Sequence, residues 1–146
     1  MALWQAPIDG GAHMQLIERA ARDPVISPDG KLVACLYVDE QTSLPSRLAV
    51  MSFAGKSPVN VFDLSPDFDL ISPIRWTSDG RALTYIDTRD GTSNIWRQPL
   101  TGGPPQQMTD FKAERILFFA WSRGARYLAY ARGDEVNDVV MISSSG

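Results

Sequence analysis

The 146-residue sequence has one cysteine and one histidine, too few to supply the roughly four soft ligands of a structural zinc site. Cys35 cannot form an internal disulfide, and within the apolar run Leu32–Val38 its thiol should act as a small hydrophobe. A Ser-His-Asp triad would have to use His13, and no Gly-x-Ser-x-Gly elbow presents a nucleophile. We therefore expect no catalytic residue, no metal site and no cofactor.

Clustered positive charge and long apolar runs are also missing. The net charge is -3 and the basic residues are scattered, whereas binding to a phosphate backbone needs grouped Lys and Arg. No stretch approaches the ~18 consecutive apolar residues of a membrane span, and the N-terminus lacks the layout of a signal peptide. Nucleic acid and membrane insertion are therefore not expected.

What the sequence does contain is an internal repeat. Ser27-Pro28-Asp29-Gly30 returns as Thr77-Ser78-Asp79-Gly80 and, weakened, as Ser122-Arg123-Gly124-Ala125. Each copy lies between two apolar runs, which is the pattern of strand, turn and strand. Repeats at periods of tens of residues are typical of solenoids and propellers.

A second motif repeats in phase with the first. The segment from Leu3 to Gly11 matches that from Ile95 to Gly103, with tryptophan, proline and both glycines coinciding. Apolar positions after these turns open one more short strand, which favours a strand over a helix at Met14–Ile17. The Asp-Gly and Gly-Gly pairs supply the positive φ that tight hairpins require. The repeating unit is therefore predicted to hold four strands.

The whole chain, residues 1–146, is predicted to be one all-β segment of about three four-stranded antiparallel propeller blades. The expected divisions are outer strands of a preceding blade in residues 1–20, blades in 24–63 and 73–109, and three strands of a last blade in 116–143, the third at Val139–Ser143. Propellers typically close with 4 to 8 blades, so about three blades cannot close a ring.

This blade pattern resembles the TolB-like, or WD-repeat-like, β-propeller repeat. It looks most like the C-terminal half of the propeller attached to many bacterial serine/threonine protein kinases. The segments that carry this resemblance are Pro73–Trp76, Asn94–Leu100, Phe119–Ser122 and Asp138–Ser143. The pattern departs at Gly124-Ala125, where Asp-Gly is expected, and this weakens the turn.

The resemblance implies six blades, protein or ligand binding at the ring faces and often an extracytoplasmic (periplasmic) setting. It does not imply kinase activity, because the chain has no glycine-rich nucleotide loop, strand lysine or Asp-Phe-Gly motif. The ring would be completed by a second copy in a homodimer, or by the rest of a longer parent chain.

The leading candidate for a ligand contact is Arg75, because its repeat equivalents are Val25 and Ala120 and a charge on an innermost strand needs a partner or water. Asp69 and Arg115 are further candidates, although the long loop that carries Asp69 is expected to face solvent. The periodic tryptophans are expected to pack between blades. The segment Asp87–Asn94 has oxygen ligands spaced loosely like a calcium loop, but a plain hairpin is favoured.

Two functions follow from these features. The first is a non-enzymatic scaffold that presents loop surfaces to a protein or peptide. The second is a propeller that binds a small ligand or metal and serves an enzyme domain, of a kinase or peptidase, outside this chain. A third, structural interpretation is a half-ring that assembles with itself.

Overall fold

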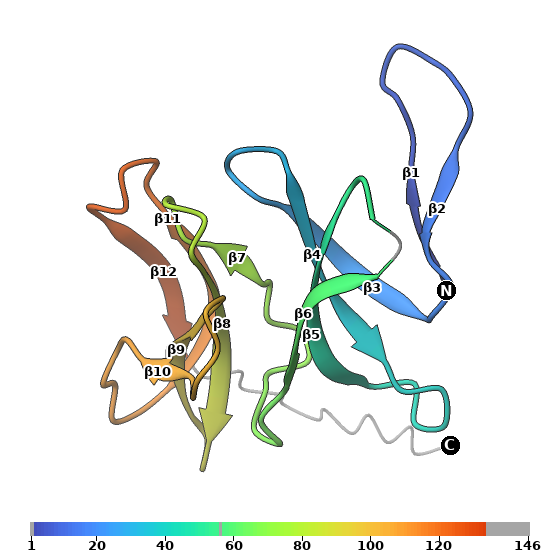
Figure 1. Ribbon diagram of the computed structural model, residues 1–146. Helices are drawn as coiled ribbons and strands as arrows, with labels where there is room; N and C mark the ends of the chain where they lie inside the picture. Colours follow the sequence, from blue (N-terminus) through green and yellow to red (C-terminus); the bar gives the residue numbers. More distant parts are fainter. Residues whose placement is uncertain (1, 56, 134–146) are drawn as a thin grey trace, which may run out of the picture.

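The computed structural model describes residues 2–55 and 57–133, which form twelve strands (Figure 1). No helix in this part of the chain is long and apolar enough to cross a membrane. The strands are β1 (Leu3–Gln5), β2 (Met14–Ile17), β3 (Ala21–Ile26), β4 (Leu32–Val38), β5 (Pro45–Ser52), β6 (Pro58–Asp63), β7 (Arg75–Trp76), β8 (Ala82–Arg89), β9 (Thr92–Pro99), β10 (Gln106–Gln107), β11 (Arg115–Trp121) and β12 (Leu128–Gly133).

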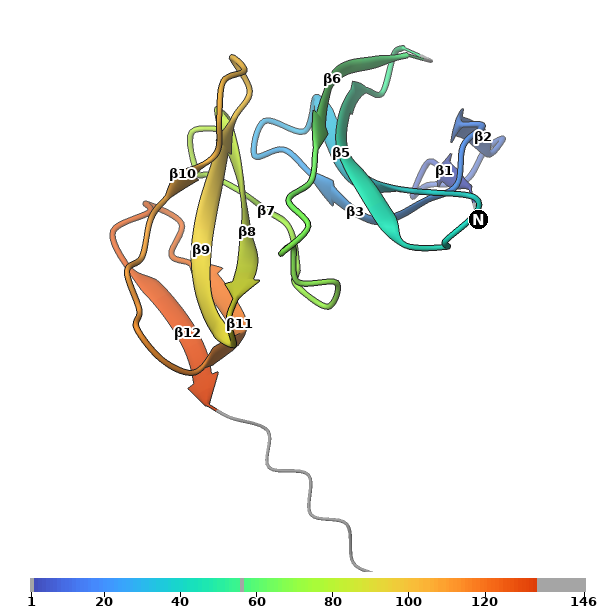
Figure 2. The same ribbon diagram turned by 90° about the horizontal axis from the view of Figure 1, so that it is seen from below.

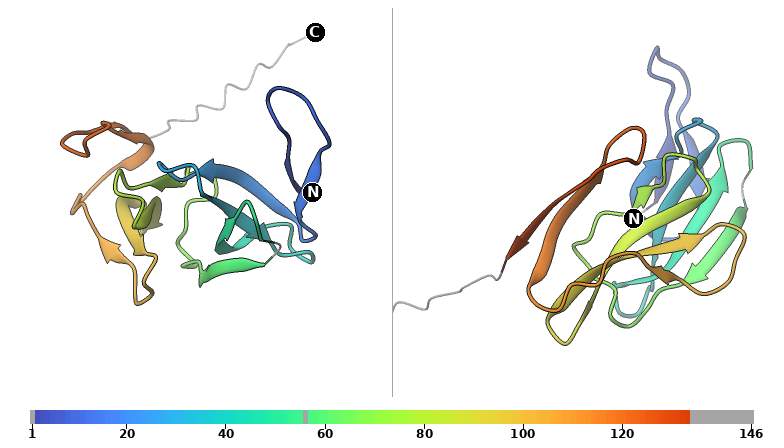
Figure 3. Two further views of the ribbon diagram at one scale, coloured as in Figure 1. Left: turned by 45° about the horizontal axis from the view of Figure 1, so that its top comes forward. Right: turned by 90° about the vertical axis from the view of Figure 1, so that its left-hand side faces the viewer.

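The strands form four antiparallel sheets that follow one another along the chain. Two are complete four-stranded blades, in the orders β3-β4-β5-β6 and β7-β8-β9-β10. The two-stranded sheets β1–β2 and β11–β12 lie at opposite ends of the row, as Figures 2 and 3 show. This arrangement confirms the predicted all-β, partial-propeller fold. The predicted strand Val139–Ser143 lies outside the described residues.

The first blade starts earlier than the predicted boundary at Pro24, because β3 begins at Ala21. The register of β3 against β4 shifts between Arg22 and Val25, which is a β-bulge. Pro24 lies inside that bulge, where its missing N–H group breaks no ladder hydrogen bond. A proline that the sequence places between strands is therefore accommodated within one.

Two of the three Ser/Thr-containing turns share one hydrogen-bonding pattern, and the third, which has Gly124 in place of the aspartate, keeps only the bond from the Tyr127 N–H to the Ser122 hydroxyl. In the first, the Ser27 hydroxyl donates to the Asp29 carboxylate (2.6 Å) and accepts from the backbone N–H of Leu32 (2.9 Å). The hydroxyl of Thr77 makes the same contacts with Asp79 and Ala82. In these two turns the aspartate of the motif therefore holds the turn together through local hydrogen bonds.

The core lies within and between the blades. Cys35 is fully buried among apolar side chains, and burial raises the pKa of its thiol to about 12. Trp76 and Trp121 each join neighbouring sheets: the Trp76 indole N–H donates to the Val25 carbonyl (3.0 Å), and that of Trp121 donates to the Thr84 hydroxyl (3.1 Å). These two tryptophans pack between blades, as the sequence predicts.

Two positions with the same repeat phase do not follow this prediction. Trp4 is 58% exposed, whereas its equivalent Trp96 is partly buried, and Ile26 is 61% exposed, whereas its equivalent Trp76 is buried. Trp4 is in β1 and Ile26 is the last residue of β3, and for this end of the row the described chain provides no preceding inner strands. Repeat phase predicts the strand, but burial needs a neighbouring sheet.

Candidate functional site

The first strands of the sheets approach one another at a groove of about 440 Å³. Its walls come from the bulge of β3, the segment that leads into β7, and β11 (Figure 2). The β11 ladder is also bulged, between Ile116 and Phe118. Bulges bend a strand and redirect its side chains, and they are common beside binding sites. We call this cavity the inner-strand groove; its lining includes Arg22, Leu70, Ile71, Arg75 and Phe118.

Apolar side chains stand exposed in the inner-strand groove. Ile71 is 79% exposed, Phe118 65% and Leu70 44%. The backbone beneath them is held in place, since the Asp69 carboxylate accepts from the N–H of Ile71 (3.1 Å) and the Ser72 hydroxyl accepts from that of Ile86 (2.9 Å). Apolar groups on a fixed backbone favour contact with another molecule.

Arg22 joins the first blade to the groove wall. Its guanidinium donates to the Leu70 carbonyl (2.8 Å), and its Nε lies 3.1 Å from the Asp23 carboxylate without making an aligned hydrogen bond. The charge of Arg22 is thus offset by its neighbour in sequence. These two contacts hold the Arg22 side chain where it lines the groove.

Asp69 and Arg115 meet in an adjoining cavity of about 250 Å³, which shares Ile71 and Phe118 with the groove. The Arg115 guanidinium donates to Asp69 (2.9 Å), and the Thr88 hydroxyl donates to the same oxygen (3.2 Å). Asp69 is 8% exposed, so the expectation that it faces solvent is wrong. The carboxylate is buried because its bonds to Arg115, Thr88 and the backbone replace water.

Arg75 lies in the inner-strand groove with an exposed side chain. Its guanidinium donates to the Ile74 carbonyl (3.3 Å), and it forms no ion pair with a carboxylate among the described residues. Arg22 and Arg115 each have an acidic partner. Arg75 therefore supplies the uncompensated positive charge of the groove.

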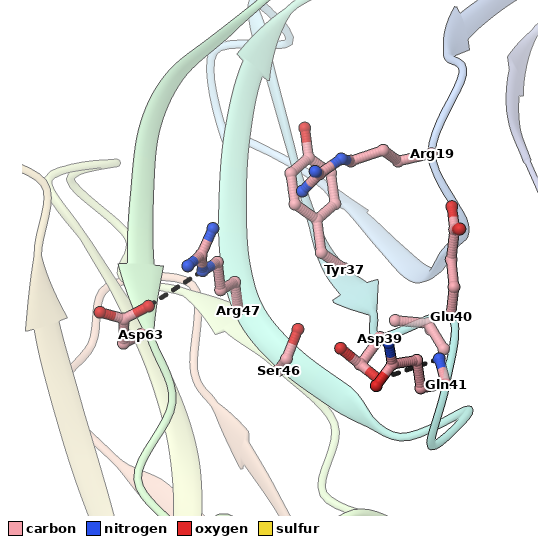
Figure 4. A pocket seen from close by; sticks show the side chains of 9 residues that line it. Arg19, Tyr37, Asp39, Glu40, Gln41, Ser46, Arg47 and Asp63 are labelled. Atoms are coloured by element: carbon pink, nitrogen blue, oxygen red, sulfur yellow. Dashed lines mark hydrogen bonds and ion pairs between the residues drawn. The ribbon is translucent and has the colours of Figure 1, made fainter.

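A third cavity, of about 580 Å³, opens at the loop after β4 (Figure 4). Here the Arg19 guanidinium lies 6.0 Å from the centre of the Tyr37 ring, and Arg47 pairs with Asp63 at 3.0 Å. Asp39 accepts from the backbone N–H of Gln41 (3.0 Å), as Figure 4 shows. The side chains labelled in Figure 4 are mostly polar, which is typical of a surface in contact with water.

The segment Asp87–Asn94 is a hairpin between β8 and β9, turning at Asp90 and Gly91, which both have positive φ (49° and 77°). That geometry fits the type I′ turn that Asp-Gly selects. Asp87 is 2% exposed, and its desolvation raises the pKa of its carboxyl group although Arg89 donates to it. No group of three or more potential metal-ligating side chains occurs in the described part of the chain.

The inner-strand groove offers an arginine, apolar surface and fixed backbone, which suits binding. Of the residues that the sequence singled out, the structure places Arg75 in the groove, and Asp69 and Arg115 in the adjoining cavity. Sequence reasoning missed Arg22, Ile71 and Phe118. Of these, Arg22 had a detectable signal, because it is a charged residue near the start of an innermost strand, as Arg75 is.

No family model matches the sequence, and no curated protein matches it. Solved structures do. A putative TolB from Agrobacterium tumefaciens superposes with a TM-score of 0.67 at 20% identity over 94% of this chain. TolB from Acinetobacter baumannii gives 0.64 at 20% identity over 88%, and the isopeptidase AtxE2 gives 0.52 at 22% identity over 77%.

The chain spans less than half of each of these proteins: 48% of the Agrobacterium protein, 31% of the Acinetobacter protein and 21% of the isopeptidase. At this level of sequence identity, the superpositions show similarity of fold alone. The resemblance to kinase-linked propellers stays a prediction. The order of the strands, the blade-to-blade tryptophans and these superpositions together show that the chain has the fold of part of a TolB-like β-propeller.

Proposed function

We propose that the chain is a non-enzymatic β-propeller scaffold that binds a protein or peptide segment in the inner-strand groove. The observation that carries the proposal is the combination, in one groove, of exposed Ile71 and Phe118 with the unpaired guanidinium of Arg75. Apolar anchors beside a charged group are the usual composition of a binding site. The TolB-like fold supports a scaffold role in general.

The groove chemistry defines the segment that it would take. Ile71 and Phe118 would contact an apolar side chain, and Arg75 would pair with a carboxylate of the bound chain. A peptide with an apolar residue close to an acidic residue, or to its own C-terminus, fits this description.

Selection from a display library of random linear peptides tests the proposal. The wild-type chain should enrich a common motif, and Phe118→Asp and Arg75→Glu should each lose binding to the enriched peptides at least about tenfold. Val59→Asp is a matched control because Val59 is 57% exposed, lies on β6 at the outer edge of the first blade and does not line the groove. Equal binding by the groove variants and the control would reject this site.

A second function is kept because one structural neighbour is an isopeptidase. In this alternative the propeller admits a small ligand or metal and serves an enzyme domain outside the chain. A thermal-shift screen with divalent metals and metabolites separates the two functions, since a ligand that binds the native state raises the melting temperature. A shift that Arg75→Glu abolishes, without peptide enrichment, would favour the alternative.

A further inference from the structure

The cavity of about 250 Å³ beside the inner-strand groove is lined largely by apolar side chains. Ile86 and Ile116, which are buried, line its inner part, and the exposed side chains of Ile71, Leu117 and Phe118 surround its opening. Pockets for whole small molecules usually measure about 300 to 1,000 Å³, so this cavity suits a single large side chain. We call it the anchor pocket.

The two walls of the anchor pocket are fixed by hydrogen bonds within the chain. The backbone N–H of Asp69 donates to the Ile86 carbonyl (3.0 Å), and the Ser72 hydroxyl accepts from the Ile86 N–H (2.9 Å), so the loop before β7 is bonded to β8. The guanidinium of Arg115, at the start of β11, donates to the Asp69 carboxylate (2.9 Å). A preformed pocket loses little binding free energy to ordering.

The ion pair in the wall of the anchor pocket keeps unused hydrogen-bonding capacity. A carboxylate has about four lone-pair sites, and that of Asp69 accepts from the Ile71 N–H, Arg115 and Thr88. Among the described residues, the Arg115 side chain donates only to Asp69; it is 36% exposed, and its Nε is buried without a partner. An acceptor site and several donors are therefore left beside an apolar cavity.

This combination discriminates between large side chains. A phenol is apolar over its ring, and its hydroxyl both donates and accepts a hydrogen bond. A phenyl ring would leave the polar groups of the wall without a partner, and an indole N–H can only donate. A carboxylate would be repelled by Asp69. Of these groups, the phenol alone can pair with both Asp69 and Arg115.

We infer that the anchor pocket receives a tyrosine side chain, with its ring against Ile116 and Phe118 and its hydroxyl between Arg115 and Asp69. The inference rests on the proposed function and deepens it, because this tyrosine is the apolar residue of the bound peptide. The anchor pocket shares Phe118 with the groove, which Arg75 also lines. The bound segment would therefore carry a tyrosine close to an acidic residue or to its own C-terminus.

The peptides enriched by library selection give the first test. They should contain tyrosine, and its replacement by phenylalanine should weaken binding about tenfold or more, because a hydrogen bond to a charged group is lost. Peptides that depend on Arg75 but bind equally well with tyrosine or phenylalanine overturn the inference. The proposed function would survive that result.

Two variants test whether the preference for tyrosine comes from the pocket wall. Arg115→Gln should abolish the preference, because it removes the guanidinium that the phenol oxygen contacts. Thr88→Val is the matched control, because Thr88 also bonds to Asp69 but does not line the anchor pocket, and it should keep the preference. Thermal unfolding checks that both variants are folded. An unchanged preference in a folded Arg115→Gln protein contradicts the assigned position of the hydroxyl.

Small probes test the anchor pocket of the wild-type chain without a peptide. N-acetyl-tyrosinamide at millimolar concentration should shift the methyl NMR signals of Ile86 and Ile116, and N-acetyl-phenylalaninamide should shift them less. The methyl signal of the exposed Ile8, which does not line the pocket, is the internal control. No shift at Ile86 and Ile116, or equal shifts with both amides, overturns the inference. A selective shift without any peptide enrichment would reject the proposed function and support the pocket as a phenol site.

Discussion

The complete blades and the two end sheets are built from one repeat, yet their side chains have different surroundings. Tyr85 in the second blade is 2% exposed, and its equivalent Tyr130 in the last sheet is 47% exposed. Trp76 is buried against β3, and its equivalent Ile26 has no such neighbour in the described chain. The contrast shows that a blade forms its strands locally but obtains its burial from the next sheet.

The largest expected difference is between Trp76→Ala and Ile26→Ala. Trp76→Ala should lower the free energy of unfolding by about 3 to 5 kcal/mol, because it empties a buried site and removes the bond to Val25. Ile26→Ala should cost less than about 1 kcal/mol in the single chain, because Ile26 is exposed there. Urea unfolding of dilute protein measures both. Equal losses would show that Ile26 already has a partner within the chain.

The joint between the second blade and the last sheet gives the next prediction. Asp69→Ala should cost about 1 to 3 kcal/mol, since it leaves the N–H of Ile71 and the guanidinium of Arg115 without an acceptor. Asp67→Ala in the same loop removes an exposed pair with Arg89 and should change stability by less than about 1 kcal/mol. Thermal unfolding of the two variants compares them. A harmless Asp69→Ala would mean that the joint contributes little.

The turns distinguish complete from incomplete blades by a smaller effect. Ala125 occupies the position of Gly30 and Gly80 with a φ of 50°, which is unfavourable for a residue with a Cβ atom. Ala125→Gly should therefore stabilise the chain by about 1 kcal/mol, and Gly80→Ala (φ 67°) should destabilise it by a similar amount. Chemical denaturation detects both. The same sign for both substitutions would contradict the equivalence of these turns.

The smallest expected effect depends on pH. Hydrogen bonds, first from the Thr77 hydroxyl and then from the N–H of Arg81, lower the pKa of Asp79. A carboxyl whose pKa falls on folding contributes stability above its unfolded pKa of about 3.9 and loses it as the pH drops through the folded value. Asp79→Asn should therefore reduce the loss of stability below about pH 4. In the last sheet Gly124 stands at the position of Asp79. The Asp79→Asn variant therefore leaves neither turn with a carboxyl group at this position that titrates in acid.

Asp29 in the first blade provides an independent comparison for this effect. Its pKa is lowered by the Ser27 hydroxyl and the N–H of Lys31, as that of Asp79 is by Thr77 and Arg81. Asp29→Asn should likewise reduce the loss of stability in acid, and acid titration monitored by tryptophan fluorescence measures this. If both variants lose stability in acid as the wild-type chain does, the hydrogen bonds to Asp29 and Asp79 do not persist in solution.

The repeat made the fold predictable from sequence, because each local signal pointed to the same unit of four strands. Asp90-Gly91 predicts a hairpin and forms one with positive φ at both residues. The candidate site was harder to predict. Arg75 was found because its equivalents are apolar, but Ile71 and Phe118 are ordinary apolar residues, one in the loop before β7 and one in the bulged strand β11, whose exposure depends on how these segments come together.

Sequence alone determined the period, the turns and the strands, because these depend on residues close together in the chain. Tertiary structure decided which repeated side chains are buried. Asp69 is buried because Arg115, far along the chain, reaches it, and Trp4 is exposed because the described chain gives its sheet no inner strands. Burial is a property of the space between sheets, and no single repeat contains that space.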